Sequence, residues 1–432
     1  MERRWSVLKI LSDRETDPQI YKYLKRNWFL SYMDGILIIG GMGFVSVSTV
    51  LTYFVSEFTD SRIIIGLLTS IFLLGKYLPQ MLGAKILEGL SHNKGYVNLF
   101  GLLQRLPWFG MAFITYRYAL EKPSFTLLTF YLLYGFYTVA SGMFNPGWLD
   151  LIAKVIPVNL RGRFFGIRKF LGGGMQFFGS FVVAWLFTNY AFPTNYTIAF
   201  LIAGISSSIS YLFLINMKEV GKERVVKKIS LYEYTKKLPT ILKDNRNFSN
   251  YIIASMFIVF YNMATAFYII YGKDQLGIGT ESVGILTGIL LATQSMFSIF
   301  WGYVSDKKGH KFVLIMSTVL FILSTIIIYR TQTILWLYIV FFINGAATSA
   351  REVSEMNIVL EFSEPEDRPT YLGLNNTLIA PLVSLTPLFG GIILDYFSYK
   401  ILYILSILLM VTGLVVLGKK VKDPRYIEED LA

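Results

Sequence analysis

Three ionisable residues stand inside long apolar stretches of the N-terminal half: Asp34, Lys76 and Arg105. An ionisable group inside a membrane-spanning segment costs about 2.5 to 3.5 kcal/mol on insertion scales, so such groups usually mark a paired site or a pathway. One interpretation is a structural pair of Asp34 with Arg105 or with Lys76. The other leaves one cation unpaired, where it attracts an anionic solute or exchanges its partner with a coupling proton on Asp34. The remaining possibilities are that the charges snorkel to the membrane surface or form a cytoplasmic gate. With one carboxylate and two cations the formal excess is +1, and Lys76 is the expected contact for the anion.

The apolar stretches of the C-terminal half are expected to carry no central charge and to offer only neutral polar groups. Amides and phenols can hydrogen-bond a solute, but between membrane helices they also hold helices together, at about 0.6 kcal/mol each. For any single residue the structural role is the better interpretation. The candidates are Tyr261, Asn262, Gln294, Asn344 and Asn376.

Twelve apolar windows of about 20 residues, the length that crosses a bilayer as a helix, are expected to position these side chains. The sequence therefore predicts an all-α polytopic membrane protein with twelve transmembrane helices. The expected spans are 28–54, 62–87, 96–116, 124–147, 165–188, 196–217, 248–271, 282–303, 312–329, 334–350, 370–393 and 399–418.

The composition supports this fold class and excludes others. With 54% hydrophobic and 16% charged residues, the chain is too apolar for a soluble protein of 432 residues. The net charge of +12 is divided among segments between apolar runs, so it does not indicate nucleic-acid binding. The chain has no cysteine, two histidines that fall in expected loops, and no nucleotide-binding glycine loop. We therefore expect no enzyme activity, no metal and no cofactor.

Lys and Arg fall mostly in one set of alternating connections, which predicts that both termini are cytoplasmic. Residues 1–27 carry no apparent cleaved signal peptide. A polar linker, 218–247, separates an N-terminal bundle with its leading segment, 1–217, from a C-terminal bundle with a short tail, 248–432. Part of the linker, Ile229 to Leu242, is either an amphipathic helix on the membrane surface or a solvated linker. The acidic stretch from Arg351 to Arg368 is expected to be a loop.

Two short patterns repeat at about half the chain length. The segment from Arg161 to Arg168 recurs from Arg368 to Asn375, an offset of 207, and Ser91 to Gly95 recurs from Ser305 to Gly309, an offset of 214. Each match is weak alone, but two matches at equivalent connections favour two related six-helix halves.

The second copy of this glycine-containing turn carries a carboxylate and several cations, a composition suited to a short hinge between two membrane helices. It resembles the signature loop of the major facilitator superfamily, roughly Gly-x-x-x-Asp-Arg/Lys-x-Gly-Arg/Lys-Arg/Lys. The matching positions are Gly302, Asp306, Lys307, Gly309 and Lys311. The first copy departs from that signature, with Glu88 where it has glycine and His92 where it has the carboxylate.

The resemblance implies two pseudo-symmetric six-helix bundles and a gating role for the signature loop. It also implies that the loop after the fourth span holds the cytoplasmic side closed, through Asp150, Arg161, Arg163 and Arg168. Charge counting alone assigns these residues only to membrane orientation.

These observations predict a secondary transporter that moves a small, anionic or carboxylate-bearing solute by alternating access, with proton coupling. The alternatives are a drug or lipid efflux carrier, and a membrane sensor of transporter fold that moves nothing. The expected partners are the solute, membrane lipids and a coupling proton, with no nucleic acid, and the protein is expected to be a monomer. The expected location is a bacterial or archaeal plasma membrane.

Overall fold

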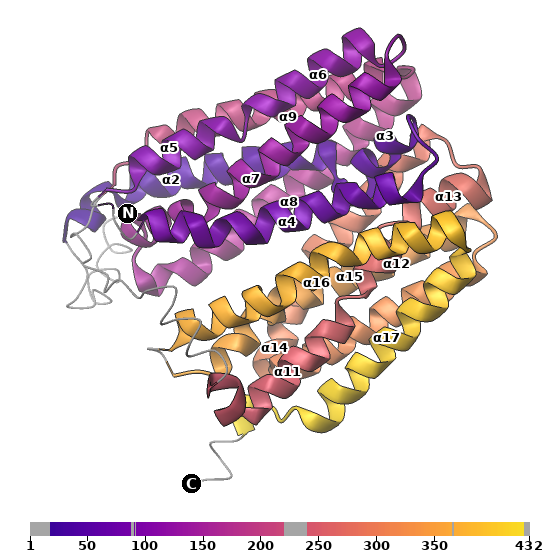
Figure 1. Cartoon of the computed structure of the whole chain (residues 1–432). Helices are drawn as coiled ribbons and strands as arrows, with labels where there is room; N and C mark the ends of the chain where they lie inside the picture. The colour runs from indigo at the N-terminus through magenta and orange to yellow at the C-terminus, as the bar shows by residue number, and fades with distance from the viewer. Residues whose placement is uncertain (1–17, 88–89, 91, 220–239, 365–366, 427–432) are drawn as a thin grey trace.

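The computed structural model of the chain consists of helices arranged in two groups (Figure 1). It describes residues 18–87, 90, 92–219, 240–364 and 367–426. All the regular elements in these residues are helical, which confirms the predicted all-α class. The interpretation of Ile229 to Leu242 as an amphipathic helix falls largely outside the described residues. The linker's role as a domain boundary stays a prediction.

The N-terminal half runs from α2 to α9. Two short helical turns at 43–45 and 47–51 join α2 to α3, at a point where Ser46 leaves the helical conformation. The helices are α2 (Pro18–Met42), α3 (Thr52–Ser56), α4 (Arg62–Leu87), α5 (Lys94–Leu103), α6 (Leu106–Tyr118), α7 (Pro123–Val155), α8 (Val158–Asn189) and α9 (Thr194–Ile215).

The C-terminal half runs from α11 to the short turn η3. Its first span is divided by non-regular residues around Phe260 and Phe267. The elements are α11 (Arg246–Ile258), α12 (Tyr261–Thr265), α13 (Tyr268–Leu276), α14 (Thr280–Arg330), α15 (Ile334–Glu361), α16 (Arg368–Tyr396), α17 (Tyr399–Lys420) and η3 (Pro424–Tyr426).

Ten helical stretches in the described residues, two of them interrupted by short breaks, are long and apolar enough to cross a membrane. The predicted span 96–116 is not among them, because it is broken into α5 and α6 at Gln104 and Arg105. The predicted spans 282–303 and 312–329 both lie in α14, whose 51 residues would extend about 77 Å if straight. Gly309 interrupts α14 with φ of 81°, a conformation that favours glycine. The count of twelve stays a prediction.

Three expected loops are shorter than the sequence suggests. Residues 302–308 of the signature segment are helical up to Gly309. The loop after the fourth span is reduced to residues 156–157, so Asp150 lies in α7, and Arg161, Arg163 and Arg168 lie in α8. The acidic stretch from Arg351 is also not a loop at its start, because α15 continues to Glu361.

In both halves a pair of hydrogen bonds joins the start of the half to the segment that follows its last helix. The sequence analysis did not predict this repeat. In the N-terminal half the amide of Asn27 donates to the carbonyl of Lys218 (2.9 Å) and accepts from its N–H (2.9 Å). In the C-terminal half Asn247 makes the same two bonds with Lys422, at 3.0 and 2.8 Å. Each half therefore ties its first helix to the residues that follow its last one.

The acid after Lys218 also has a defined partner. The carboxylate of Glu219 accepts the backbone N–H groups of Asn93 and Lys94 at the start of α5, and pairs with Lys154 at 2.8 Å. Burial raises the pKa of Glu219, but these hydrogen bonds and the charge of Lys154 outweigh it and bring the pKa below its ordinary value. A carboxylate at a helix start is also favoured by the helix dipole.

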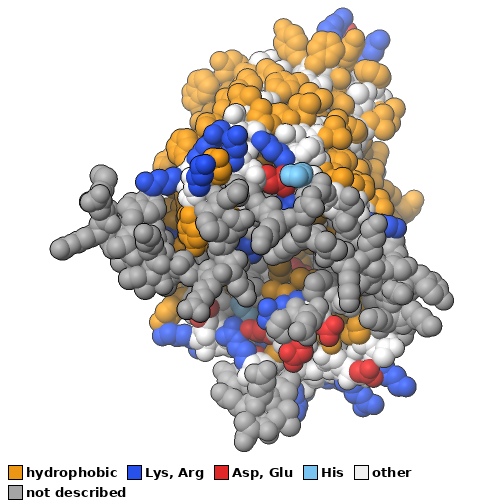
Figure 2. All heavy atoms as spheres, turned by 90° about the vertical axis from the view of Figure 1, so that its left-hand side faces the viewer, with side chains coloured by type: hydrophobic (Ala, Val, Ile, Leu, Met, Phe, Trp, Pro, Cys, Tyr) orange, Lys and Arg blue, Asp and Glu red, His pale blue; other side chains and the backbone are white. Residues whose placement is uncertain are grey.

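The outer surface is apolar over most of its extent. Large side chains such as Phe113, Tyr116 and Phe178 are more than 60% exposed, and many more lie on the outward faces of α6, α7 and α8. An apolar surface this extensive is not stable in water but suits lipid. Lys and Arg gather at the end of the molecule shown in Figure 2. The chain is therefore a multi-pass integral membrane protein.

Candidate functional site

The two halves are joined at one end of the molecule by ion pairs. We call this the closed end; it comprises the start of α4, the ends of α3, α13 and α16, and the start of α17, on the right in Figure 1. Arg62 pairs with Asp274 at 2.7 Å, and Lys273 pairs with Glu57 at 3.0 Å. Both pairs link an N-terminal-half residue to a C-terminal-half residue. We call the opposite end, where α2 starts and α17 ends, the terminus end.

A carboxylate of the C-terminal half also caps a helix of the N-terminal half. Asp395, at the end of α16, accepts the backbone N–H of Arg62 at 2.6 Å and that of Ile63 at 3.1 Å. It also accepts the hydroxyl of Ser61 at 2.9 Å. The first N–H groups of a helix lack internal partners and attract negative charge. Asp395 therefore satisfies the start of α4 only while this end is closed.

We expect Asp395→Asn to reduce the population of the closed end. Losing a helix cap costs about 0.5 to 2 kcal/mol, which corresponds to about a 2- to 30-fold change in the equilibrium between closed and open forms. Spin-label distances across this end measure that change, because the chain has no cysteine of its own to interfere. Asp60→Asn, at an exposed neighbouring carboxylate, is the control. An unchanged distance distribution in Asp395→Asn would argue against the cap.

A cavity of about 330 Å³ lies among the helices of the N-terminal half. It contains all three ionisable residues that the sequence singled out, together with amides and aromatic rings. The lining residues are Asp34, Ile38, Met42, Phe72, Lys76, Gln80, Gln104, Arg105, Tyr137, Thr138, Ser141, Gly142, Phe144, Asn145, Trp148 and Arg168. We call it the N-terminal cavity.

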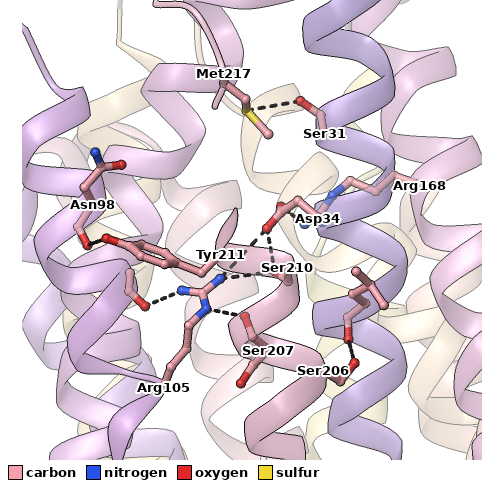
Figure 3. Close-up of polar contacts among 12 residues, drawn as sticks. Ser31, Asp34, Asn98, Arg105, Arg168, Ser206, Ser207, Ser210, Tyr211 and Met217 are labelled. Atoms are coloured by element: carbon pink, nitrogen blue, oxygen red, sulfur yellow. Dashed lines mark hydrogen bonds and ion pairs between the residues drawn. The ribbon is translucent and has the colours of Figure 1, made fainter. Parts of the chain in front are cut away.

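Asp34 is held by three partners (Figure 3). Its side chain is only 3% exposed. One oxygen accepts the hydroxyl of Ser210 at 2.7 Å and lies 3.9 Å from Arg105, and the other accepts from Arg168 at 3.1 Å. The structure therefore brings Asp34 together with Arg105, as one of the two interpretations requires, and adds a second arginine.

Arg105 uses its guanidinium to stabilise a break in the fold (Figure 3). Nε donates to the carbonyl of Ser207 at 2.6 Å, Nη2 donates to Ser210 at 3.1 Å, and Nη1 donates to the carbonyl of Gly101. Gly101 lies in the last turn of α5, so Arg105 caps the helix that ends just before it. Each guanidinium nitrogen has a partner, and this favours a structural role for Arg105.

Lys76 lies near the middle of α4 and differs from Asp34 and Arg105, which pair with each other. Its side chain is exposed and lines the N-terminal cavity. In the described part of the chain no carboxylate lies within 4 Å of its ammonium group, and the charges of Glu352 and Glu355 reach it only from the other half. Of the ionisable residues that the sequence singled out, Lys76 is the one left available to a solute.

Arg168 is the site residue whose place the sequence analysis misjudged. The resemblance put it in a cytoplasmic loop, whereas the structure places it on α8 at the wall of the N-terminal cavity. Its guanidinium lies over the ring of Trp148 at 4.4 Å and pairs with Asp34, but its Nε is buried and has no partner among the described residues. The spacing alone could have signalled this, since Arg168 lies inside the predicted span 165–188.

The five polar candidates of the C-terminal half do not gather at one place. Tyr261 stacks on Phe321 with ring centroids 4.0 Å apart, and Asn262 donates to the carbonyl of Val259 at the junction of α11 and α12. Asn344 is buried, and its side-chain oxygen has no partner among the described residues. Asn376 accepts a long bond from Asn375. Of these contacts only the stacking of Tyr261 on Phe321 joins two helices, α12 and α14, and the two asparagine hydrogen bonds are local.

Gln294 lines a second cavity, of about 450 Å³, that both halves share. This inter-half cavity adjoins the N-terminal cavity, because Trp148 and Arg168 line both. Its C-terminal wall includes Gln294, Ser295 and Glu352. A solute in the N-terminal cavity is therefore close to a polar surface of the other half.

The predicted spans of the C-terminal half contain no central charge, but α15 extends beyond the predicted span 334–350 and carries a charge there. Arg351 is buried within α15 and pairs with Glu355 one helical turn later at 2.5 Å. Its guanidinium also lies 5.3 Å from the ring of Tyr261. The apolar window ends at Ala350, but the helix continues because Arg351 is neutralised within its own helix.

The signature residues meet the C-terminal segment at the terminus end. Arg425 donates to the carbonyls of Ser305 and Asp306 at 2.9 and 3.3 Å and pairs with Glu361 at 2.6 Å. Within the described residues, the carboxylate of Asp306 itself has no ion pair. The remaining predicted residues of the signature segment lie nearby as follows: Gly302 faces open space, Lys307 lies over the ring of Tyr303, and Lys311 donates to the carbonyl of Gly418.

The residues predicted after the fourth span make local contacts. Arg161 donates to the carbonyls of Ala153 and Ile156, at the end of α7. Asp150 pairs with Lys154 at 3.2 Å and accepts from Asn93, and Arg163 is exposed. Among the described residues, the ion pair between Lys169 and Glu352 joins the halves on this side, at 3.1 Å. In the part of the chain that is described, no cluster of His, Asp or Glu is placed to hold a metal ion.

Comparisons with known proteins agree with this architecture. The sequence profile described as Major Facilitator Superfamily matches residues 248–430. No curated protein sequence matches the chain.

Among solved structures, a D-xylose-proton symporter has a TM-score of 0.69 at 15% identity, covering 93% of this chain and 99% of its own. The nucleoside transporter NupG has a TM-score of 0.67 at 15% identity, covering 90% and 98%. A POT family transporter in complex with a thioalcohol-conjugated peptide has a TM-score of 0.69 at 14% identity, covering 92% and 96%. At these identities the likeness shows the fold alone.

Proposed function

We propose that this chain is a transporter of the Major Facilitator Superfamily, whose profile matches its C-terminal half and whose fold it shares, and that it moves a small anionic solute across the membrane by alternating access. Transporters with two related halves bind their solute near the bilayer midplane and expose it to each side in turn by rocking one half against the other. The similar structures are a nucleoside transporter, a POT family transporter with a bound peptide conjugate and a D-xylose-proton symporter, and they do not select a solute for this chain.

The observation that carries the proposal is the unpaired ammonium of Lys76 in a cavity between a closed end and the terminus end. Because Lys76 is exposed on the cavity wall, a solute can reach its ammonium group, and an anion bound there gains a charge-assisted hydrogen bond. The halves meet at the closed end through ion pairs, the helix cap, side-chain hydrogen bonds and packing of helix on helix. All of these are contacts between side chains or helix ends of separate helices, so they can separate without unfolding either half. With the termini cytoplasmic, as charge counting predicts, the closed end faces outward and the solute site opens inward.

We include proton coupling in the proposal, and transport in proteoliposomes tests both parts. The purified chain is reconstituted, a pH gradient is imposed, and uptake of labelled organic anions is compared with uptake of sugars, peptides and cationic drugs. Accumulation of an anion that collapses with a proton ionophore is the expected result. Accumulation of a cationic drug instead would favour an efflux carrier, and binding without movement would favour a sensor. Liposomes without protein are the control.

Asp306→Asn is expected to slow transport severalfold while expression and solute binding stay close to normal. The carboxylate of Asp306 has no ion pair in the described structure, which has the closed end formed, so it is available to a helix end when the terminus end closes. Asp244→Asn, at another exposed carboxylate of the terminus end, is the control for a general charge effect. Normal uptake by Asp306→Asn would remove the gating role.

A further inference from the structure

We propose that the solute is a small dianion, a dicarboxylate or a phosphate monoester, whose two charges are met by Lys76 and Arg168 in the N-terminal cavity. This inference rests on the proposed function and specifies its substrate class. It uses Arg168, which the sequence analysis assigned to a loop, and it requires two negative charges where the sequence predicted one.

The charge of the cavity wall supports two charges on the solute. Lys76, Arg105 and Arg168 contribute three positive charges and Asp34 one negative charge, so the wall carries 3 − 1 = 2 net positive charges. The nearest carboxylates of the other half do not cancel this excess, because Glu352 pairs with Lys169 and Glu355 pairs with Arg351. In surroundings of low dielectric constant, a dianion neutralises the wall where a monoanion leaves one charge uncompensated.

Among the described residues, Lys76 and Arg168 are less fully occupied by protein acceptors than Arg105. All three guanidinium nitrogens of Arg105 donate to groups of the protein. Arg168 gives Nη2 to Asp34, but its buried Nε has no partner among the described residues. Lys76 has three donors and no ion pair in the described part of the chain. A solute that accepts from both cations forms charge-assisted hydrogen bonds, which are about twice as strong as neutral ones.

The size and remaining lining of the cavity restrict the solute further. A volume of about 330 Å³ is at the lower end of the usual range for small-molecule sites, about 300 to 1,000 Å³. The amides of Gln80, Gln104 and Asn145 can bond oxygen atoms on the body of the solute. A short polar dianion therefore suits the cavity better than a peptide or a large amphiphilic drug.

A charge series of nearly constant size tests the proposal. Succinate, its monoamide and its diamide carry two, one and no negative charges at pH 7.5, and glycerol phosphate is compared with glycerol. Thermal stabilisation of the purified full-length chain reports binding, since it grows with ligand concentration relative to Kd. We expect succinate to bind about tenfold or more tightly than its monoamide, or glycerol phosphate to bind about tenfold or more tightly than glycerol. This is the effect of losing a charge-assisted hydrogen bond.

Two variants locate the contacts. Lys76→Gln and Arg168→Lys are each expected to weaken dianion binding about tenfold or more and to bring it close to that of the monoamide. Arg168→Lys keeps a cation beside Asp34, so it tests the guanidinium without removing that ion pair. Lys85→Gln, an exposed lysine on the same helix, removes the same charge outside the cavity and should leave binding unchanged. If Arg168→Lys does not fold, Lys76→Gln alone still decides.

The outcomes separate this inference from the proposed function. If succinate and its monoamide bind equally well and glycerol phosphate no better than glycerol, the dianion is wrong, although an anion transporter stands. If all anions fail while a neutral or cationic solute binds, both are wrong. If dianions bind but Lys76→Gln and Lys85→Gln behave alike, the binding site is elsewhere and the inference fails. The dicarboxylate and phosphate arms identify which oxyanion is preferred.

Discussion

Asp34→Asn is expected to reduce the free energy of unfolding by about 3 to 5 kcal/mol, because it leaves the buried guanidinium of Arg105 without a counter-charge. Asp34 and Arg105 are each only 3% exposed, so water cannot replace the lost carboxylate charge. The same substitution removes the partner of Arg168 and an acceptor for Ser210. Through these contacts Asp34 links α2 to α8, α9 and the break between α5 and α6.

A double-mutant cycle measures this effect. Asp34→Asn, Arg105→Gln and the combined variant are unfolded by heat or denaturant in the same detergent. If the pair is structural, the combined variant is less destabilised than the sum of the single variants, since it leaves no isolated charge. Lys76→Gln is the matched control for loss of a charge from the same cavity and should unfold close to the wild type. A stable Asp34→Asn variant that has lost only proton-driven uptake would restore the coupling role of Asp34.

The sequence was sufficient for the fold class, because apolar windows of bilayer length depend on composition and not on tertiary contacts. It was also sufficient to find Asp34, Lys76 and Arg105, since a charge within an apolar window is conspicuous. It could not decide which cation is free. That depends on Ser210 and Arg168, which lie 176 and 134 residues from Asp34 and meet it only in the folded bundle.

Arg351 and Arg168 were both misplaced because charge pairing was not foreseen, although only Arg351 lies beyond its apolar window. A span predicted from hydropathy ends where charged residues begin, whereas a helix in the structure ends where its backbone hydrogen bonds end. Arg351 and Glu355 neutralise each other one turn apart, so α15 continues past the apolar window. Arg168 finds a counter-charge in Asp34, so α8 carries it into the protein interior. Pairing of charges, which sequence periodicity does not show, decides both cases.

Gly284→Leu is expected to abolish transport while both halves stay folded. Gly284 lies near the start of α14 and faces Ala184 of α8, in the other half, where the halves meet next to the closed end. A Cβ at this position would come within 3.0 Å of backbone atoms of Ala184, which cannot move unless the helix moves. Thr49 and Thr287 bond across the same contact at 2.6 Å. A larger side chain therefore separates the halves here without changing the contacts inside either one.

Overpacking of this kind costs about 1 to 3 kcal/mol, which shifts a two-state equilibrium about 5- to 150-fold. Spin labels on Lys122→Cys and Lys400→Cys, one in each half near the closed end, should report a longer distance in the Gly284→Leu background. Gly135→Leu is the control, because a Cβ at Gly135 meets no atom within 4 Å. Since alternating access requires this end to close in every cycle, a variant held open there binds solute but does not carry it across. Wild-type uptake by Gly284→Leu would show that the contact between α8 and α14 is not required, and the rocking of the two halves would then need a different pivot.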